Sequence, residues 1–168
     1  LAKIVGLNGE ILSKIIVPLF MLISALTMFY LGKTLKFSDE SAFFMGLFYM
    51  LTPVLYNRII AGHHLYNFAY AISPLFFAFL HKYIYHKQKF SYILIAALVF
   101  GMSAVQVQFP LMLAFMTTLY LLLFIISKKT LDSVVISLRA IAILVVLFIA
   151  LNSFWTVSYT HLRAHETE

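Results

Sequence analysis

Four polar side chains that can bind an anion or a sugar lie close together in an otherwise apolar chain. The stretch from position 56 to 74 reads YNRIIAGHHLYNFAYAISP and contains Arg58, the neighbours His63 and His64, and Asn67. The guanidinium of Arg58 has a planar fork of donors that matches phosphate oxygens, and imidazole is a further donor to an anionic group. The amide of Asn67 offers the donor and the acceptor that sugar hydroxyls need. These residue types predict a ligand-binding site for a phosphate or a sugar.

Two other interpretations of the same residues stay open at this point. Adjacent residues on a helix point about 100° apart, so His63 and His64 are poorly placed to chelate one ion, and a zinc site needs three or four ligands. We therefore predict no metal site here. An interfacial loop whose imidazoles and guanidinium contact lipid headgroups and water would explain the same residues without a specific ligand.

The adjacent carboxylates Asp39 and Glu40 could share acid and base roles, but their position favours a structural role. They lie in FSDESAFF, where an apolar run begins. Acidic side chains at such a place interact with the positive end of a helix and cap its free N–H groups. Asp132, in KKTLDSVV, has the same kind of position. We expect all three to mark the beginnings of helices.

The elements that carry these residues must lie in a membrane. The 168 residues are 63% hydrophobic and only 11% charged, whereas about a quarter of the residues in a soluble domain are charged. The basic residues lie between apolar runs and form no helical stripe, so the net charge of +6 does not indicate nucleic-acid binding. With no cysteine, the chain has no disulfide, thiol nucleophile or Cys-ligated metal.

Six apolar segments approach the roughly 20 residues that a helix needs to cross a bilayer core. None alternates with period two along its length, which argues against transmembrane β-strands. The sequence therefore predicts an all-α fold, a polytopic bundle of about six membrane-spanning helices, with the lipid bilayer as partner and the plasma membrane as location. The six segments are Ile15–Leu31, Ala42–Tyr56, Leu65–Leu80, Phe90–Val105, Leu111–Ile126 and Ala140–Trp155.

Proline and small residues predict local detail within these segments. Pro53 and Pro74 lie inside the second and third segments, where an interior proline removes a helical hydrogen bond and kinks the helix. Two kinked helices beside one polar interval suggest a cleft. The pair Ala97-x-x-x-Gly101 predicts a place where two helix backbones approach closely.

The distribution of lysine and arginine predicts the orientation. The turns after the first, third and fifth segments contain eight of these residues, and the other side contains three. The positive-inside rule places the eight in the cytoplasm, so the interval 58–67 and the turn with Gln106 and Gln108 are external. Gln108 is therefore a fifth candidate for substrate binding. The eight are Lys33, Lys36, Lys82, Lys87, Lys89, Lys128, Lys129 and Arg139, and the three are Lys3, Lys14 and Arg58.

The two ends of the chain differ from its middle. Residues 1–156 are assigned to the transmembrane domain, and residues 157–168 to a tail. From Val157 the sequence VSYTHLRAHETE turns abruptly polar, and it resembles translated adapter sequence found in some assembled metagenomic data; a disordered tail is the alternative. His161 and His165 are therefore not assigned to a site. Because residue 1 is leucine, we expect the chain to be a fragment of a larger protein.

The run MGLFYMLTPVLYNRIIAGHHLYNFAYAISPLFFAFLHKY resembles the polytopic membrane glycosyltransferases of the GT-C superfamily. Three features carry the resemblance: a Tyr-x-x-x-Pro-like helix end at Tyr49 and Pro53, a Gly-His element at Gly62–His63, and a basic turn at Lys82–Lys89. The later turn SAVQVQFP is similar to the family's Ser-x-His-Pro-Gln-like outer turn but lacks the histidine. The likeness extends from about position 21 to position 126.

The resemblance implies sugar transfer from a polyprenyl-phosphate-linked donor at the outer face. The family's catalytic carboxylate lies in the first external loop, so the catalytic residue is expected upstream of Leu1 and the fragment itself is not expected to be active. Glu10, the one acidic residue on the external side, is interpreted as part of an amphipathic stretch that precedes the first apolar segment. A divalent metal in the full-length parent stays open.

Two rival interpretations come from other classes of membrane protein. They are a transporter or lipid-flippase component, and a non-catalytic membrane subunit. Proton-coupled and ion-coupled carriers usually have charged groups near the middle of the bilayer. No Asp, Glu, Lys or Arg lies well inside any of the six segments, which weighs against a pump or coupled carrier.

Overall fold

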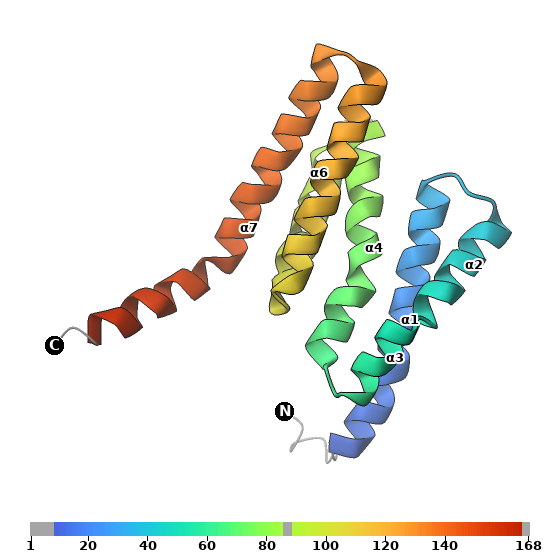
Figure 1. The fold of residues 1–168 in the computed structure, drawn as a ribbon, viewed down its shortest axis with the longest axis vertical. Helices are drawn as coiled ribbons and strands as arrows, with labels where there is room; N and C mark the ends of the chain where they lie inside the picture. The colour runs from blue at the N-terminus through green and yellow to red at the C-terminus, as the bar shows by residue number, and fades with distance from the viewer. Residues whose placement is uncertain (1–8, 86–88, 166–168) are drawn as a thin grey trace. The chain divides into compact units, whose positions relative to one another are not determined.

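The computed structural model describes residues 9–85 and 89–165, with side chains described for 14–85 and 89–153. Every regular element in these ranges is helical, which confirms the all-α class. The chain divides within α4 into two compact units, Leu1–Ala78 and Phe79–Glu168. The elements are α1 (Gly9–Thr34), α2 (Asp39–Met50), α3 (Pro53–Ile60), α4 (His64–Tyr85), α5 (Phe90–Met102), the 3-10 turn η1 (Ser103–Val105), α6 (Gln108–Lys128) and α7 (Leu131–His165) (Figure 1).

Four helical segments are long and apolar enough to cross a bilayer, which supports the assignment to a membrane. They are Lys14–Thr34, Asp39–Ile60, Gln108–Lys128 and Leu131–Ser153. The expected count of about six is only roughly matched. Helix α5 is apolar but has 13 residues, and α4 is not among the four.

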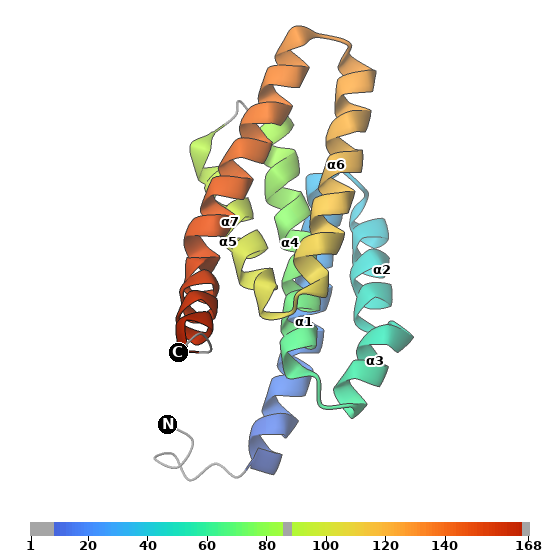
Figure 2. The ribbon, with the colours of Figure 1, turned by 60° about the vertical axis from the view of Figure 1, so that its left-hand side comes forward.

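Small residues allow α1 and α2 to pack closely in the first unit (Figures 1 and 2). A Cβ atom added to Gly46 would lie 2.6 Å from the carbonyl oxygen of Ala25, and one added to Gly32 would lie 3.0 Å from the Cβ of Ala42. Ala42 itself is fully buried. Glycine and alanine at these places permit a backbone approach that larger side chains would prevent.

Replacing Gly46 with alanine is expected to destabilise the protein by about 1–3 kcal/mol, because backbone rather than a flexible side chain must move to make room. Gly101→Ala is the matched control, since its new Cβ would meet only side-chain atoms of Leu151; the closest, the terminal Cδ1 at 2.5 Å, can rotate away, and the Cβ at 3.3 Å needs only a small shift. Thermal unfolding in detergent measures both variants. Equal midpoints for the two variants would contradict the claim that α1 and α2 touch through their backbones.

The beginning of α2 confirms the structural role predicted for the paired carboxylates. The helix begins at Asp39, and both Asp39 and Glu40 lie in its first turn. Ser38 caps the helix by accepting a hydrogen bond from the backbone N–H of Ser41 at 3.2 Å. Asp39 also forms an ion pair with Lys33 at the end of α1. Asp132 likewise lies in the first turn of α7, as predicted.

The two prolines differ in what they do to the backbone. Pro74 lies inside the continuous helix α4. Pro53 does not kink a continuous helix as expected, because α2 ends at Met50 and Pro53 is the first residue of α3. The first helical position needs no N–H donor, so proline is well suited to it. The second apolar segment is therefore two helices joined by a break at positions 51 and 52.

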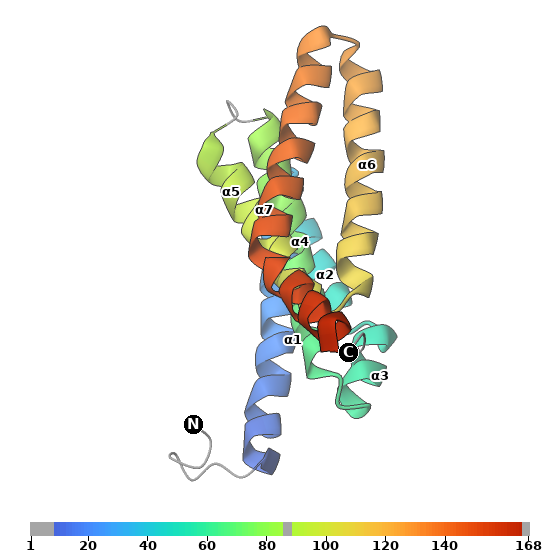
Figure 3. The ribbon, with the colours of Figure 1, turned by 90° about the vertical axis from the view of Figure 1, so that its left-hand side faces the viewer.

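The second unit contains the end of α4 together with α5, α6 and α7 (Figure 3). Helix α5 packs against α7, where Gly101 and Ala97 are both buried and Gly101 faces Leu151. The pair lies at the contact with α7, but the atoms nearest to Gly101 belong to the side chain of Leu151, so the predicted approach of two helix backbones is not seen at this residue. Lys129, in the left-handed conformation with φ 52°, ends α6 before the turn into α7.

Helix α7 continues to His165 and so includes most of the tail predicted at residues 157–168. Residues 166–168 lie outside the described range, as do all side chains after Ser153. The boundary at residue 157 and the origin of the tail remain predictions.

Candidate functional site

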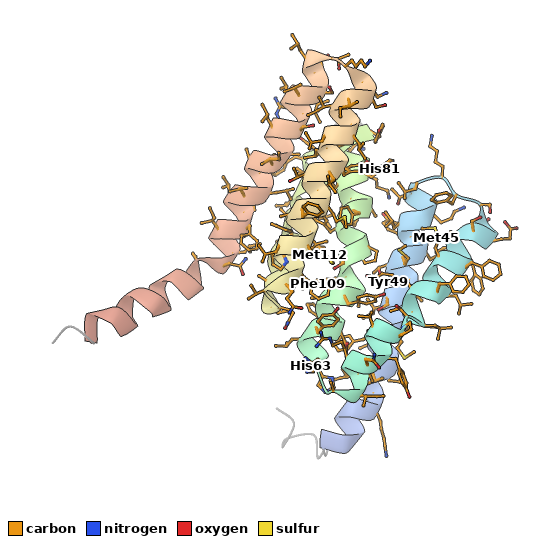
Figure 4. The ribbon with its side chains drawn as sticks, in the orientation of Figure 1. Met45, Tyr49, His63, His81, Phe109 and Met112 are labelled. Carbon is orange, nitrogen blue, oxygen red and sulfur yellow. The ribbon has the colours of Figure 1, made fainter. Side chains whose placement is uncertain are left out.

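Four of the five candidate residues lie where α3 meets α4 in the first unit. We call residues 53–69 the α3–α4 corner. It contains Arg58 on α3, His63 in the connecting turn, and His64 and Asn67 in the first turns of α4. Figure 4 labels His63 at this turn. Gln108, the fifth candidate, is an exposed residue at the beginning of α6 in the second unit, so its role in the same site stays a prediction.

A Schellman motif makes the turn of the corner. Gly62, with φ +71°, follows the helix cap at Ala61, and its N–H donates to the carbonyl of Ile59 at 3.0 Å. The N–H of His63 donates to the carbonyl of Arg58, also at 3.0 Å. These two bonds satisfy the last carbonyls of α3, and glycine is favoured here because a left-handed φ has no Cβ penalty. The carbonyl of His63 then accepts from the N–H of Asn67 at 3.1 Å and starts α4.

Because His63 both completes the end of α3 and begins α4, the turn between the two helices is short. The side chain of His63 is exposed, while that of His64 is partly buried. The adjacent histidines therefore differ: His63 lies just before α4 with its side chain exposed, and His64 is the first residue of α4 with its side chain partly buried.

Arg58 is held against an aromatic ring of the neighbouring helix. Its guanidinium carbon lies 4.7 Å from the ring centroid of Tyr66 on α4, a cation–π contact. The Arg58 side chain is half-buried, and no carboxylate of the described residues pairs with it. The flat face of the guanidinium is thus covered, while its N–H groups keep no anionic partner. Such a group is prepared for an anionic ligand, because its charge is not neutralised within the corner.

Asn67 is fully buried, yet neither Oδ1 nor Nδ2 of its amide has a hydrogen-bond partner among the described residues. The Nδ1 atom of His64 is also buried and without a partner there. The two residues are three positions apart on α4 and so share one face of the helix. A buried polar group left unpaired costs about 1–3 kcal/mol, so these three atoms need hydrogen-bond partners that the described residues do not provide.

An apolar groove lies next to the polar residues in the same unit. It has a volume of about 260 Å³ and includes Pro53, Tyr56 and Ile59 of α3, together with Met21, Met50 and Leu51. Ile59 directly follows Arg58, so α3 contributes both to the apolar groove and to the charged group. A second groove of about 470 Å³ runs along α2 and reaches α4; it is lined by Met28, Ser41, Phe44, Met45, Phe48, Tyr49, Thr52 and Tyr70. Figure 4 labels Met45 and Tyr49.

The groups of the corner are suited to binding an anion. Among the described residues, no three His, Cys, Asp or Glu side chains come close enough together to hold a metal. Positions 41–131 contain no acidic residue, so the corner has no carboxylate of its own to act as a general base. Its groups are one cation, two imidazoles and one amide, which can hold an anion that also carries hydroxyl groups.

Tyr66 is the contributor to this corner that the sequence analysis missed. It is eight positions after Arg58 across a turn, and only the geometry of that turn brings the two side chains together. The alternation of aromatic and polar residues in HHLYNFAY was the available signal, but the same pattern is common at a membrane interface.

Compared with protein-family models, curated proteins and solved structures, the chain gave no significant match.

Proposed function

We propose that this chain belongs to a multi-pass, membrane-embedded, glycosyltransferase-like protein of the plasma membrane, and that its α3–α4 corner binds a polyprenyl-phosphate-linked sugar at the outer face. The observation that carries the proposal is the state of Arg58, which is half-buried on the ring of Tyr66 without a described carboxylate partner. A phosphate supplies the missing charge. The unpartnered atoms of His64 and Asn67 supply hydrogen bonds to phosphate oxygens or sugar hydroxyls.

The apolar groove beside the corner supports a lipid-linked ligand rather than a free one. A polyprenyl phosphate joins a long apolar chain to a charged head, and α3 presents the matching pair: Pro53, Tyr56 and Ile59 at the groove, and Arg58 at the polar side. Burial of the isoprenoid chain contributes free energy in proportion to the apolar area that is covered, while the guanidinium selects the head group.

Binding of a polyprenyl phosphate to the purified chain in nanodiscs tests the proposal. We expect the phosphate to bind at least about tenfold more tightly than the polyprenol of the same length, because a hydrogen bond to a charged group contributes about 1.5–3 kcal/mol. Arg58→Ala should remove most of this preference. Arg58→Lys should keep part of it, since the charge remains while the planar fork and the stacking on Tyr66 are lost.

Lys36→Ala is the matched control, because Lys36 is an exposed cation of the same unit in the lysine-rich turn before α2. It should leave the phosphate preference unchanged. Inorganic phosphate serves as a competitor, and weak competition is expected because it lacks the apolar chain. If the ratio of the affinities for polyprenyl phosphate and polyprenol is the same in Arg58→Ala as in the original protein, the assignment of the phosphate head group to this corner is wrong.

The alternative function is a transporter or lipid-flippase component, or a non-catalytic membrane subunit. It is compatible with the lack of any acidic residue between positions 41 and 131, since binding or moving a lipid needs no carboxylate at the corner. Reconstituted vesicles with a fluorescent polyprenyl-phosphate-linked sugar separate the two functions. Faster movement of the lipid between leaflets would support the flippase alternative, whereas binding without movement would exclude it and leave the glycosyltransferase-like protein and the non-catalytic subunit.

A further inference from the structure

Two prolines of the first unit each leave a carbonyl without its helical donor. A proline at position i removes the N–H that would pair with the carbonyl at position i−4. For Pro53 this carbonyl belongs to Tyr49, and for Pro74 it belongs to Tyr70. Both prolines therefore follow a tyrosine at the same spacing, in the matching sequences YMLTP and YAISP.

The two tyrosines satisfy these carbonyls reciprocally. The hydroxyl of Tyr70 donates to the carbonyl of Tyr49 at 2.9 Å, and the hydroxyl of Tyr49 donates to the carbonyl of Tyr70 at 2.9 Å. Their rings are stacked with centroids 4.2 Å apart and an interplanar angle of 10°. We call this arrangement the tyrosine clasp; Figure 4 labels Tyr49. Each hydroxyl thus replaces the donor that the proline of the other segment removed.

The clasp closes the part of the chain that contains the candidate site. Positions 50–69 lie between its two residues, and they include α3, the turn and the first residues of α4. Arg58, His63, His64 and Asn67 are all within this interval. Joining the ends of a segment reduces the number of conformations that the segment can adopt. A second bond, from Thr27 Oγ1 to the carbonyl of Ala71 at 2.7 Å, fixes α4 to α1 next to the clasp.

The break between α2 and α3 makes this closure necessary. The backbone is not helical at positions 51 and 52, so α3 could change its direction relative to α2. The corner's polar groups come from both α3 and α4, and their separation depends on that direction. We infer that Tyr49 and Tyr70 are positioning residues, which hold Arg58 and Asn67 at the separation that the ligand requires. This inference rests on the proposed function, because it concerns affinity at the same corner.

Tyr49→Phe is the variant that tests the inference, because it removes one hydroxyl and keeps the ring stack. The carbonyl of Tyr70 then has no donor from either Pro74 or residue 49. Spin labels on Val54→Cys and Leu65→Cys report the distance between α3 and α4; both positions are exposed, and the chain has no other cysteine. We expect a broader distance distribution in Tyr49→Phe and a loss of about fivefold in affinity for polyprenyl phosphate, as one lost hydrogen bond predicts.

Rescue by the matching proline distinguishes the clasp from a general loss of packing. Pro74→Ala in the Tyr49→Phe background provides a backbone N–H for the carbonyl of Tyr70, so the distance distribution should narrow and the affinity should recover. Pro53→Ala in the same background is the mismatched control. Its new N–H would serve the carbonyl of Tyr49, which is already paired with the hydroxyl of Tyr70. This variant should neither narrow the distance distribution nor restore the affinity for polyprenyl phosphate.

The two readouts separate failure of this inference from failure of the proposed function. An unchanged distance distribution in Tyr49→Phe, or equal rescue by both proline variants, would overturn the clasp whether or not the ligand binds. A broadened distribution with unchanged affinity would overturn the positioning role alone. If the original protein does not bind polyprenyl phosphate at all, the proposed function fails, and the positioning role fails with it.

Discussion

Asn67→Leu is expected to make the protein more stable and, at the same time, to weaken its binding of polyprenyl phosphate. Asn67 is fully buried with both amide atoms unpaired among the described residues, so folding removes them from water without compensation. Leucine has a similar volume and no polar atom, and the substitution should therefore stabilise the free protein by about 1–3 kcal/mol. The ligand loses its hydrogen bonds to the amide, so we expect an affinity about tenfold lower. Thermal unfolding and ligand titration in nanodiscs measure the two quantities.

Thr117→Val is the matched control for this prediction. Thr117, on α6, is also buried, and its Oγ1 has no partner within the described side chains. Valine is nearly isosteric with threonine, so this variant should gain stability for the same reason. It should leave ligand affinity unchanged, because Thr117 is not one of the candidate ligand-binding residues. A less stable Asn67→Leu protein would show that Asn67 is held by structural hydrogen bonds, and a stabilised variant with full affinity would remove Asn67 from the site.

The helix beginnings could be predicted because their signals are local. Ser38, Asp39 and Glu40 combine a cap with charges that suit the first turn of a helix, and Asp132 repeats the pattern. The break before α3 could not be predicted in the same way. Proline in an apolar run is compatible with a kink or with a new first turn. The structure has a new first turn at Pro53, where the carbonyl of Tyr49 receives its hydrogen bond from the distant Tyr70.

The same distinction applies to the candidate site. Arg58, His63, His64 and Asn67 could be grouped from the sequence because a single turn joins them, and the turn itself follows from Gly62. The complete burial of Asn67 could not be predicted from the sequence, because it depends on which side of α4 is covered by other helices. The stacking of Arg58 on Tyr66 depends on the direction of α3, which the tyrosine clasp sets.

The Tyr-x-x-[Thr/Ser]-Pro sequence, which occurs twice, was a usable signal for this clasp. Each occurrence places a tyrosine at the carbonyl that its own proline leaves unpaired. The need for two new donors could therefore be derived from the sequence. The identity of the donors could not, because a reciprocal pair forms only if the two segments lie side by side with the rings stacked, as they do here.

The second large expected effect is a difference in chemical labelling between the α3–α4 corner and the turn before α2, which should lie on opposite sides of the membrane. His63 is exposed in the turn between α3 and α4, and Lys36 is exposed in the turn between α1 and α2. Lysine-rich turns stay in the cytoplasm because moving their charges across the bilayer is costly, so the two turns are expected on opposite sides. A lipid-linked donor at the outer face can reach Arg58 only with the corner outside. A thiol reagent that cannot cross the membrane should therefore label a cysteine at position 63 nearly completely and a cysteine at position 36 hardly at all.

The central claim, an external corner, is tested most directly by single-cysteine labelling in intact cells. The chain contains no cysteine, so His63→Cys and Lys36→Cys each introduce a single thiol. With a membrane-impermeant maleimide, we expect rapid labelling of His63→Cys and labelling of Lys36→Cys only after the membrane is permeabilised. Protection at position 63 together with labelling at position 36 in intact cells would contradict the orientation, and with it the proposed binding of a lipid-linked sugar at the outer face.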